Sequence, residues 1–265
     1  MIIIIICGFL VLSPIAVNKT SLLVDQLYRS HQSWLHQWLR QKLGNTDQAA
    51  DLVQDIFIKL LQTRDELFGI KEVAQALADP DRIDRLVGVR HLVHDEPDPG
   101  FLDRPEVARS LDLLAEAGLP LDVPDAFERH MAQVVRVAAR HPGLTVVLDH
   151  LGKPPLGDVA AMGRWREQIA AIAAAENTVA KLSGLATSGN GDFTAAADHA
   201  LSLFGPERLM VGSDWPIAPR ALDLGSGFAP LLAHVRTWSG YAAAAVTRGT
   251  AQQVYRRLGE VARTG

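Results

Sequence analysis

The chain has 265 residues, 48% of them hydrophobic, which is enough for one barrel or for two smaller domains. Its formal net charge of −4 gives no sign of a surface for nucleic acid or anionic lipid. A single cysteine, Cys7, excludes a disulfide within the chain and a cysteine-rich metal site, so we expect a reducing, cytoplasmic setting.

Residues 1–17 form an apolar leader without a charged side chain. The basic residues and the small-residue cleavage site of a secretory signal are both missing. The apolar run is also shorter than the ~20 residues that cross a bilayer. Three interpretations stay open: an adventitious leader, a sticky strand over residues 2–6, and a crude membrane signal. We expect no membrane partner.

Residues 18–67 have the pattern of two helices. Apolar residues recur every three or four positions, first between residues 23 and 39 and again between 52 and 61. Gly44 and Asn45 interrupt the pattern as a helix end does. Thr46 or Asp47 can cap the second helix. The pattern therefore predicts a helical hairpin that buries its apolar stripe.

This hairpin also resembles region 2 of the extracytoplasmic-function sigma factors, over the passage from 27 to 62. The acidic and aromatic surface with which that family binds the clamp of RNA polymerase is matched by Asp51, Gln54, Asp55 and Phe57. The resemblance implies contact with RNA polymerase. The family's promoter-melting helix and second DNA-binding domain have no counterpart, and residues 18–66 carry six basic and six acidic side chains. Direct DNA binding is therefore not expected.

From residue 84 onward, apolar strand-like runs alternate with amphipathic helical stretches, as in βαβ units around a parallel sheet. The predicted strands lie at 85–92, 119–123, 144–150, 177–184 and 208–215. Their ends are 27–33 residues apart, which fits the strand-plus-helix repeat of a (β/α) barrel. We therefore predict an α/β fold, a partial TIM-like barrel of about five strand–helix units in residues 68–265, after the N-terminal α-helical hairpin. Its open sheet edges and apolar interior favour self-association.

Two of these strands end at a side chain that can move protons, His150 in LTVVLDH and Asp214 in RLMVGSD. The carboxyl ends of parallel strands carry the chemistry of (β/α) barrels. Hydrolysis of an ester needs a base for water and a donor for the carbonyl oxygen. Asp214 suits the first task if burial raises its pKa, and His150 suits the second. A turn or helix cap for Asp214 and a core position for His150 remain open alternatives.

Residues 70–258 resemble the lactonase branch of the amidohydrolase superfamily of metal-dependent hydrolases. The resemblance is carried by GVRHLVHDEPDPGFL (88–102), VVLDHLGKPP (146–155), AKLSGLAT (180–187) and ERLMVGSDWP (207–216). Relatives open sugar lactones or pyrone dicarboxylates, so the resemblance implies a hydrolase of a small cyclic ester. It makes Asp214 the base for water and places His150 near the carbonyl. The residues that it implies for substrate contact or support are Arg90, His91, Lys153, Ser183 and Trp215.

One feature of that superfamily is missing. The His-x-His pair of its first strand, which binds metal or lactone, occurs nowhere in this sequence. His91 and His94 come nearest, but their spacing on a strand sends them to opposite faces. We therefore assign no metal ligand and expect no cofactor, although the superfamily sometimes binds a divalent metal.

The substrate residues have structural alternatives as well. Arg90 can pair with Asp95 or Glu96, and Lys153 can be exposed to solvent. For Ser183 and Trp215, the alternative is a role in packing. Three functions remain open for the whole chain: a lactone hydrolase, a polymerase-binding fragment without catalysis, and a non-functional fusion of two incomplete parts.

Overall fold

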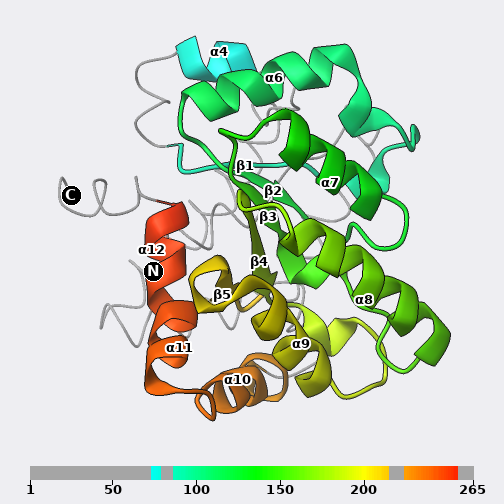
Figure 1. The fold of residues 1–265 in the computed structure, drawn as a ribbon, viewed down its shortest axis with the longest axis vertical. Helices are drawn as coiled ribbons and strands as arrows, with labels where there is room; N and C mark the ends of the chain where they lie inside the picture. Colours follow the sequence, from blue (N-terminus) through cyan, green and yellow to red (C-terminus); the bar gives the residue numbers. More distant parts are fainter. Residues whose placement is uncertain (1–72, 79–85, 215–223, 256–265) are drawn as a thin grey trace, which may run out of the picture. The chain divides into compact units, whose positions relative to one another are not determined.

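The computed structural model describes residues 73–78, 86–214 and 224–255. Within these ranges, five strands form one parallel sheet in the order β1-β2-β3-β4-β5 (Figure 1). The predicted α/β fold with five successive strand–helix units is confirmed. The leader, the hairpin of residues 18–67 and Trp215 lie outside the described residues. The same holds for the polymerase-contact residues Asp51, Gln54, Asp55 and Phe57.

The strands are shorter than the apolar runs that predicted them. They are β1 (Val89–Arg90), β2 (Leu121–Val123), β3 (Val146–Leu148), β4 (Thr178–Leu182) and β5 (Leu209–Val211). Each lies inside its predicted range, but the polar residues at its carboxyl end belong to the following loop. The parallel pairing stops there because the backbone turns into the left-handed region soon after strands β2 to β5.

Helices connect the strands and cover one side of the sheet, where α6 to α9 follow one another (Figure 1). The connecting helices are α6 (Pro105–Glu116), α7 (Met131–Arg140), α8 (Val159–Ala173) and α9 (Thr194–Phe204). The short α4 (Val73–Ala78) precedes the sheet. After β5 come α10 (Leu224–Val235), α11 (Gly240–Ala244) and α12 (Thr250–Val254).

The main core lies between the sheet and these helices. Leu148 and Leu182 point from the strands into it and are fully buried, as are Leu111 of α6 and Trp165 of α8. Burial of such apolar surface is the main stabilising contribution to the fold. The indole Nε1 of Trp165 donates a hydrogen bond to the carbonyl oxygen of Leu151 at 2.8 Å. This bond ties the loop that follows β3 to helix α8.

The other side of the sheet carries an ion cluster, formed by Arg90, Asp122, Asp149, Lys181 and Tyr255. Asp149 lies 2.7 Å from Arg90 and 2.6 Å from Lys181. The Nζ of Lys181 also lies 2.9 Å from Asp122, to which the Tyr255 hydroxyl donates at 2.7 Å. The expected apolar interior is therefore wrong at these positions, because two cations and two carboxylates are paired there.

Both signs of charge persist in the ion cluster at neutral pH. Burial alone lowers the pKa of Lys181, but the carboxylates of Asp122 and Asp149 outweigh it and hold that pKa well above its ordinary value. Burial raises the pKa of Asp149, but Arg90 and Lys181 outweigh it and lower that pKa to about 2. The Asp149 contribution to stability is therefore present above the ordinary carboxyl pKa and is lost as the pH falls toward 2.

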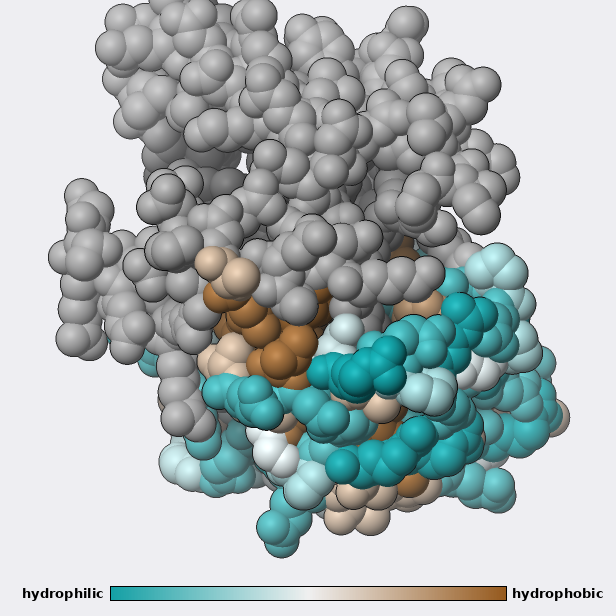
Figure 2. Space-filling model, turned by 90° about the horizontal axis from the view of Figure 1, so that it is seen from above, coloured by the Kyte–Doolittle hydropathy of each residue, from teal (hydrophilic) through white to brown (hydrophobic). Residues whose placement is uncertain are grey.

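The outer surface reflects the amphipathic pattern of the helices. Hydrophilic colours predominate on the described face that is seen in Figure 2. Of the helices in the described ranges, none is long and apolar enough to cross a membrane.

Candidate active site

Four strands are each followed by a residue in the left-handed backbone region. Two positions after β2, β3 and β4 stand Asp125 (φ 49°), His150 (φ 58°) and Gly184 (φ 59°), and three positions after β5 stands Asp214 (φ 54°). Glycine adopts this conformation freely, whereas other residues do so at a cost of about 1–3 kcal/mol. Such strain in three polar residues at one edge of a sheet is typical of a functional site.

His150 and Asp214 form the centre of this site. The Nε2 of His150 lies 3.4 Å from Oδ1 of Asp214, and each side chain is only 10% exposed. On its other side, Nδ1 of His150 lies 2.7 Å from the Ser183 hydroxyl. This second contact fixes the orientation of the imidazole ring. The structure thus brings together three of the predicted site residues from the ends of β3, β4 and β5.

The electrostatic surroundings keep Asp214 a stronger base than an exposed carboxylate. Burial raises its pKa above the ordinary value of 3.8. The charges of His150 and Lys153 oppose this rise, and the charge of Asp125 adds to it. Lys153 therefore acts on the site, although its Nζ donates its hydrogen bond to Thr187 Oγ1 at 2.9 Å. Its placement argues against the exposed alternative.

The absence of a side chain at Gly184 leaves room for the side chains of His150 and Asp214. A Cβ atom at this position would lie 2.7 Å from Oδ2 of Asp214 and 2.9 Å from Nδ1 of His150. Real Cβ atoms essentially never come this close to other heavy atoms. Either the carboxylate or the imidazole must move if residue 184 has a side chain.

We therefore predict that Gly184→Ala lowers kcat/KM about 100-fold, the effect of a misplacement of roughly 1 Å in a catalytic site. The strain of alanine at positive φ adds a loss of about 1–2 kcal/mol in the free energy of unfolding. Gly118→Ala is the matched control, because Gly118 has φ +65° but no described atom within 4 Å of its added Cβ. Equal activity in the two variants would contradict the crowding argument.

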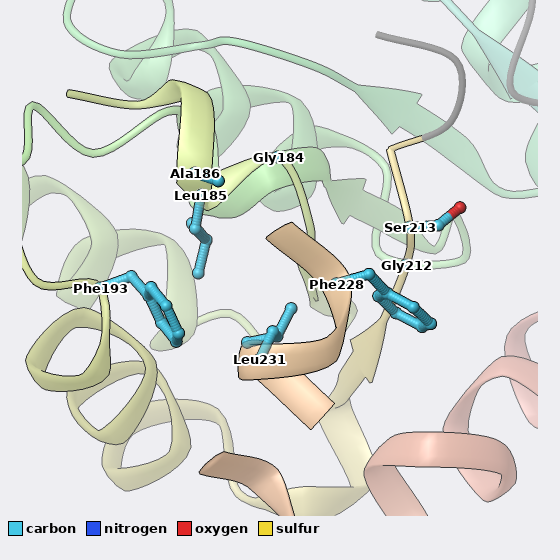
Figure 3. A pocket seen from close by; sticks show the side chains of 8 residues that line it. All are labelled: Gly184, Leu185, Ala186, Phe193, Gly212, Ser213, Phe228 and Leu231. Carbon is cyan, nitrogen blue, oxygen red and sulfur yellow. The ribbon is translucent and has the colours of Figure 1, made fainter. Parts of the chain in front are cut away.

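A small hollow of about 10 Å³, room for about one water molecule, lies beside Gly184 (Figure 3). Gly184 and Ser213, which neighbour the pair in space and in sequence, form one side of it. Leu185, Phe193 and Leu231 direct apolar side chains into it (Figure 3). The hollow is thus mainly apolar, and Ser213 contributes a polar side chain to it.

The other predicted site residues are placed differently. Arg90 lies in the ion cluster, where its carboxylate partners are Asp149 and Asp122. His91, the residue after β1, stacks on Phe101 with ring centroids 4.4 Å apart. Its Nε2 lies 2.8 Å from Glu96, the carboxylate that was one predicted partner of Arg90. These contacts place His91 against Phe101 and Glu96.

Asp125 is a member of the site that the sequence reasoning missed. It follows β2 at the same offset as His150 follows β3. Its Oδ1 is buried and has no hydrogen-bond partner among the described residues. The signal for it in the sequence is an acidic residue two positions after the predicted strand at 119–123.

A metal ion does not fit the donor set that the structure describes. Catalytic zinc sites commonly use three protein ligands. In the described ranges no group of three His, Cys, Asp or Glu side chains is arranged to hold a metal. His150 and Asp214 supply two donors only. We therefore derive no step through a metal.

Comparisons with known proteins agree with this architecture. A sequence profile of the amidohydrolase family matches residues 72–257, and one of sigma-70 region 2 matches residues 27–70. The L-fucono-1,5-lactonase of Burkholderia multivorans is 38% identical over 148 residues, which are 50% of this chain and 50% of that protein. The chain thus matches about half the length of this curated relative.

Solved structures and the amino-terminal region give two further similarities. A crystal structure of an amidohydrolase from Burkholderia multivorans with bound zinc has a TM-score of 0.61 and 32% identity, with 71% of each chain covered. The ferric citrate uptake sigma factor FecI of Escherichia coli is 30% identical over 69 residues, which are 26% of this chain and 35% of that protein. With its profile matched across more than half of the sequence, the chain belongs to the amidohydrolase family.

Proposed function

We propose that this chain hydrolyses a small cyclic ester, a sugar lactone or a pyrone-type lactone. The observation that carries the proposal is the pair of His150 and Asp214, 3.4 Å apart and nearly buried at the carboxyl end of the sheet. Membership of the amidohydrolase family and the similarity to an L-fucono-1,5-lactonase support the same class of reaction.

In the proposed reaction, the oxygen of a water molecule attacks the lactone carbonyl carbon, and Asp214 takes a proton from this water molecule. The proposed tautomer of His150 accepts from the Ser183 hydroxyl at Nδ1, 2.7 Å away, and carries its proton on Nε2. Nε2 then stabilises the oxyanion by donating a hydrogen bond. The ring C–O bond then breaks, and the protonated Asp214 returns its proton to the departing ring oxygen. The product is a hydroxy acid, which releases one proton to the solution near neutral pH.

Other residues position the substrate in this proposal. The apolar wall beside Gly184 covers the ring, and Lys153 places a positive charge near the carboxylate that accepts the proton. Trp215 follows Asp214 directly and is proposed to contact the substrate. Arg90 acts through the ion cluster, which supports the sheet beneath the site. The single cysteine supports a reducing, cytoplasmic setting for the reaction.

A pH-indicator assay with the full-length chain tests the proposal. Aldonolactones and pyrone dicarboxylates are supplied separately, and proton release is recorded against a blank without protein. We expect steady proton release with at least one lactone. An absence of turnover with every lactone would remove the hydrolase proposal and would favour the non-functional fusion.

We also predict an acid limb in the pH profile of kcat/KM, because Asp214 must be deprotonated to accept a proton from water. Activity should fall as the pH drops through the pKa of Asp214. Since burial raises that pKa, the midpoint of the limb should lie above the ordinary carboxyl value of 3.8. A limb at or below that value would contradict the proposed environment of the base.

The sigma-70 region 2 match over residues 27–70 favours a second candidate function, docking on RNA polymerase. The tagged full-length chain should then capture purified core polymerase. Asp51→Ala combined with Phe57→Ala should abolish the capture, whereas Asp112→Asn, far from this segment in sequence, should leave it intact. Capture that survives the double substitution would exclude this docking surface.

Self-association through the sheet edges remains a prediction. Sedimentation of the full-length chain at several concentrations measures it directly, and a compact monomer at every concentration would contradict it.

A further inference from the structure

The proposed hydrolysis assigns no role to Asp125. It stands two residues after β2, as His150 stands two residues after β3 and Gly184 two residues after β4. Its φ of 49° lies in the region that side chains with a Cβ rarely adopt. His150 and Asp214 have the same left-handed backbone conformation after their strands. Asp125 therefore lies at the same edge of the sheet as these two residues.

The loops after β2 and β3 are joined to each other. The backbone N–H of Phe127 donates to the carbonyl oxygen of Gly152 at 2.8 Å. Ala126, next to Asp125, is fully buried in the main core. These contacts fix the Asp125 backbone next to the loop that carries His150.

One oxygen of this carboxylate lacks a donor. Oδ1 of Asp125 is buried and makes no hydrogen bond within the part of the chain that the structure describes. Buried polar atoms are normally hydrogen-bonded, because an unsatisfied one costs about 1–3 kcal/mol. An acceptor left open beside a reaction site is suited to a donor that arrives with the substrate.

The charges around the site select the kind of donor. Arg90 and Lys181 are paired with Asp149 and Asp122 in the ion cluster. Lys153, whose Nζ donates to Thr187, is a further cation whose charge acts on Asp214. The negative charge of Asp125 acts in the opposite sense and raises the pKa of Asp214. A carboxylate accepts a hydrogen bond from a hydroxyl group and repels another carboxylate.

We propose that Asp125 determines specificity by accepting a hydrogen bond from a ring hydroxyl of a neutral sugar lactone, and that it disfavours dicarboxylated lactones. This inference rests on the proposed lactone hydrolysis and narrows its substrate class. Asp125 is a substrate-binding residue in this account and takes no part in proton transfer.

Two substitutions test the role without adding backbone strain. Asp125→Gly removes the carboxylate, and glycine is at ease at positive φ. Asp125→Asn keeps a carbonyl acceptor but removes the charge, and asparagine also tolerates this conformation. Thermal unfolding of both variants, compared with the native chain, identifies any loss of fold.

The measured quantity is a selectivity ratio, kcat/KM for an aldonolactone divided by kcat/KM for δ-valerolactone, which has no ring hydroxyl. Loss of a hydrogen bond to a charged group is worth roughly a 10- to 100-fold change, so Asp125→Gly should lower the ratio by about that factor. Asp125→Asn should recover part of the ratio and should raise kcat/KM for a pyrone dicarboxylate.

The outcomes separate this inference from the proposed function. Turnover of lactones with the same selectivity ratio in all three proteins would overturn the role of Asp125 and leave the hydrolase proposal standing. A native chain that prefers the pyrone dicarboxylate to aldonolactones would also overturn the role. No turnover of any lactone by the native chain would overturn both proposals.

Discussion

Asp214→Asn is expected to lower kcat for lactone hydrolysis by about 10²–10⁴-fold, the range typical for loss of a general base. Asparagine has nearly the same shape as aspartate but cannot take the proton from water. Because burial raises the pKa of Asp214, the ionised carboxylate is a cost to the folded state above that pKa. The substitution removes this cost, so the melting temperature should stay constant or rise.

Asp112→Asn is the control for this experiment. Asp112 is exposed and lies 2.7 Å from Nδ1 of His141, a contact that asparagine can keep. The control should have native activity and native stability. Asp214→Asn with activity within a few-fold of the native chain, or with a much lower melting temperature, would argue for a turn or cap role in place of catalysis.

Lys181→Met is expected to lower the free energy of unfolding by about 3–5 kcal/mol, the cost of breaking a buried ion pair from one side. Lys181 is 2.6 Å from Asp149 and 2.9 Å from Asp122, and its side chain is only 13% exposed. Methionine fills a similar volume but leaves a carboxylate without its cation. Urea denaturation followed by circular dichroism measures the difference.

A double variant and a surface variant make this test specific. Lys181→Met with Asp122→Asn restores the charge balance and should recover part of the lost stability. Arg164→Met removes an exposed ion pair with Glu128 and should have little effect. Equal losses for Arg164→Met and Lys181→Met would show that the ion cluster has no special contribution.

The sequence was sufficient for the order and spacing of the strands, because each strand lies within a mainly apolar run. The apolar runs that end at His150 and Asp214 also predicted that these two side chains lie at one edge of a parallel sheet. Ser183 was expected only from the family resemblance. The strand ends were predicted too long at residues 91–92, 149–150, 183–184 and 212–214. Three of the left-handed turns after the strands are made by Asp125, His150 and Asp214, and composition does not reveal a turn at residues other than glycine.

Three features depended on tertiary structure. Asp122 and Lys181 stand inside apolar runs, so their pairing across the sheet could not be read from either segment alone. His91 lies after β1, and its contacts with Phe101 and Glu96 are formed by the loop that follows this strand. Asp125 needed the structure because its significance lies in an offset shared with other strands and in a buried oxygen without a donor.

The most direct test of a carboxylate-activated water at the sheet edge is hydrolysis of an aldonolactone by the full-length chain in water enriched in heavy oxygen. Mass spectrometry of the product then locates the label. Attack of water on the carbonyl carbon predicts one heavy oxygen atom in the new carboxylate and none in the released hydroxyl. Label in that hydroxyl, or no conversion above the blank without protein, would contradict the account.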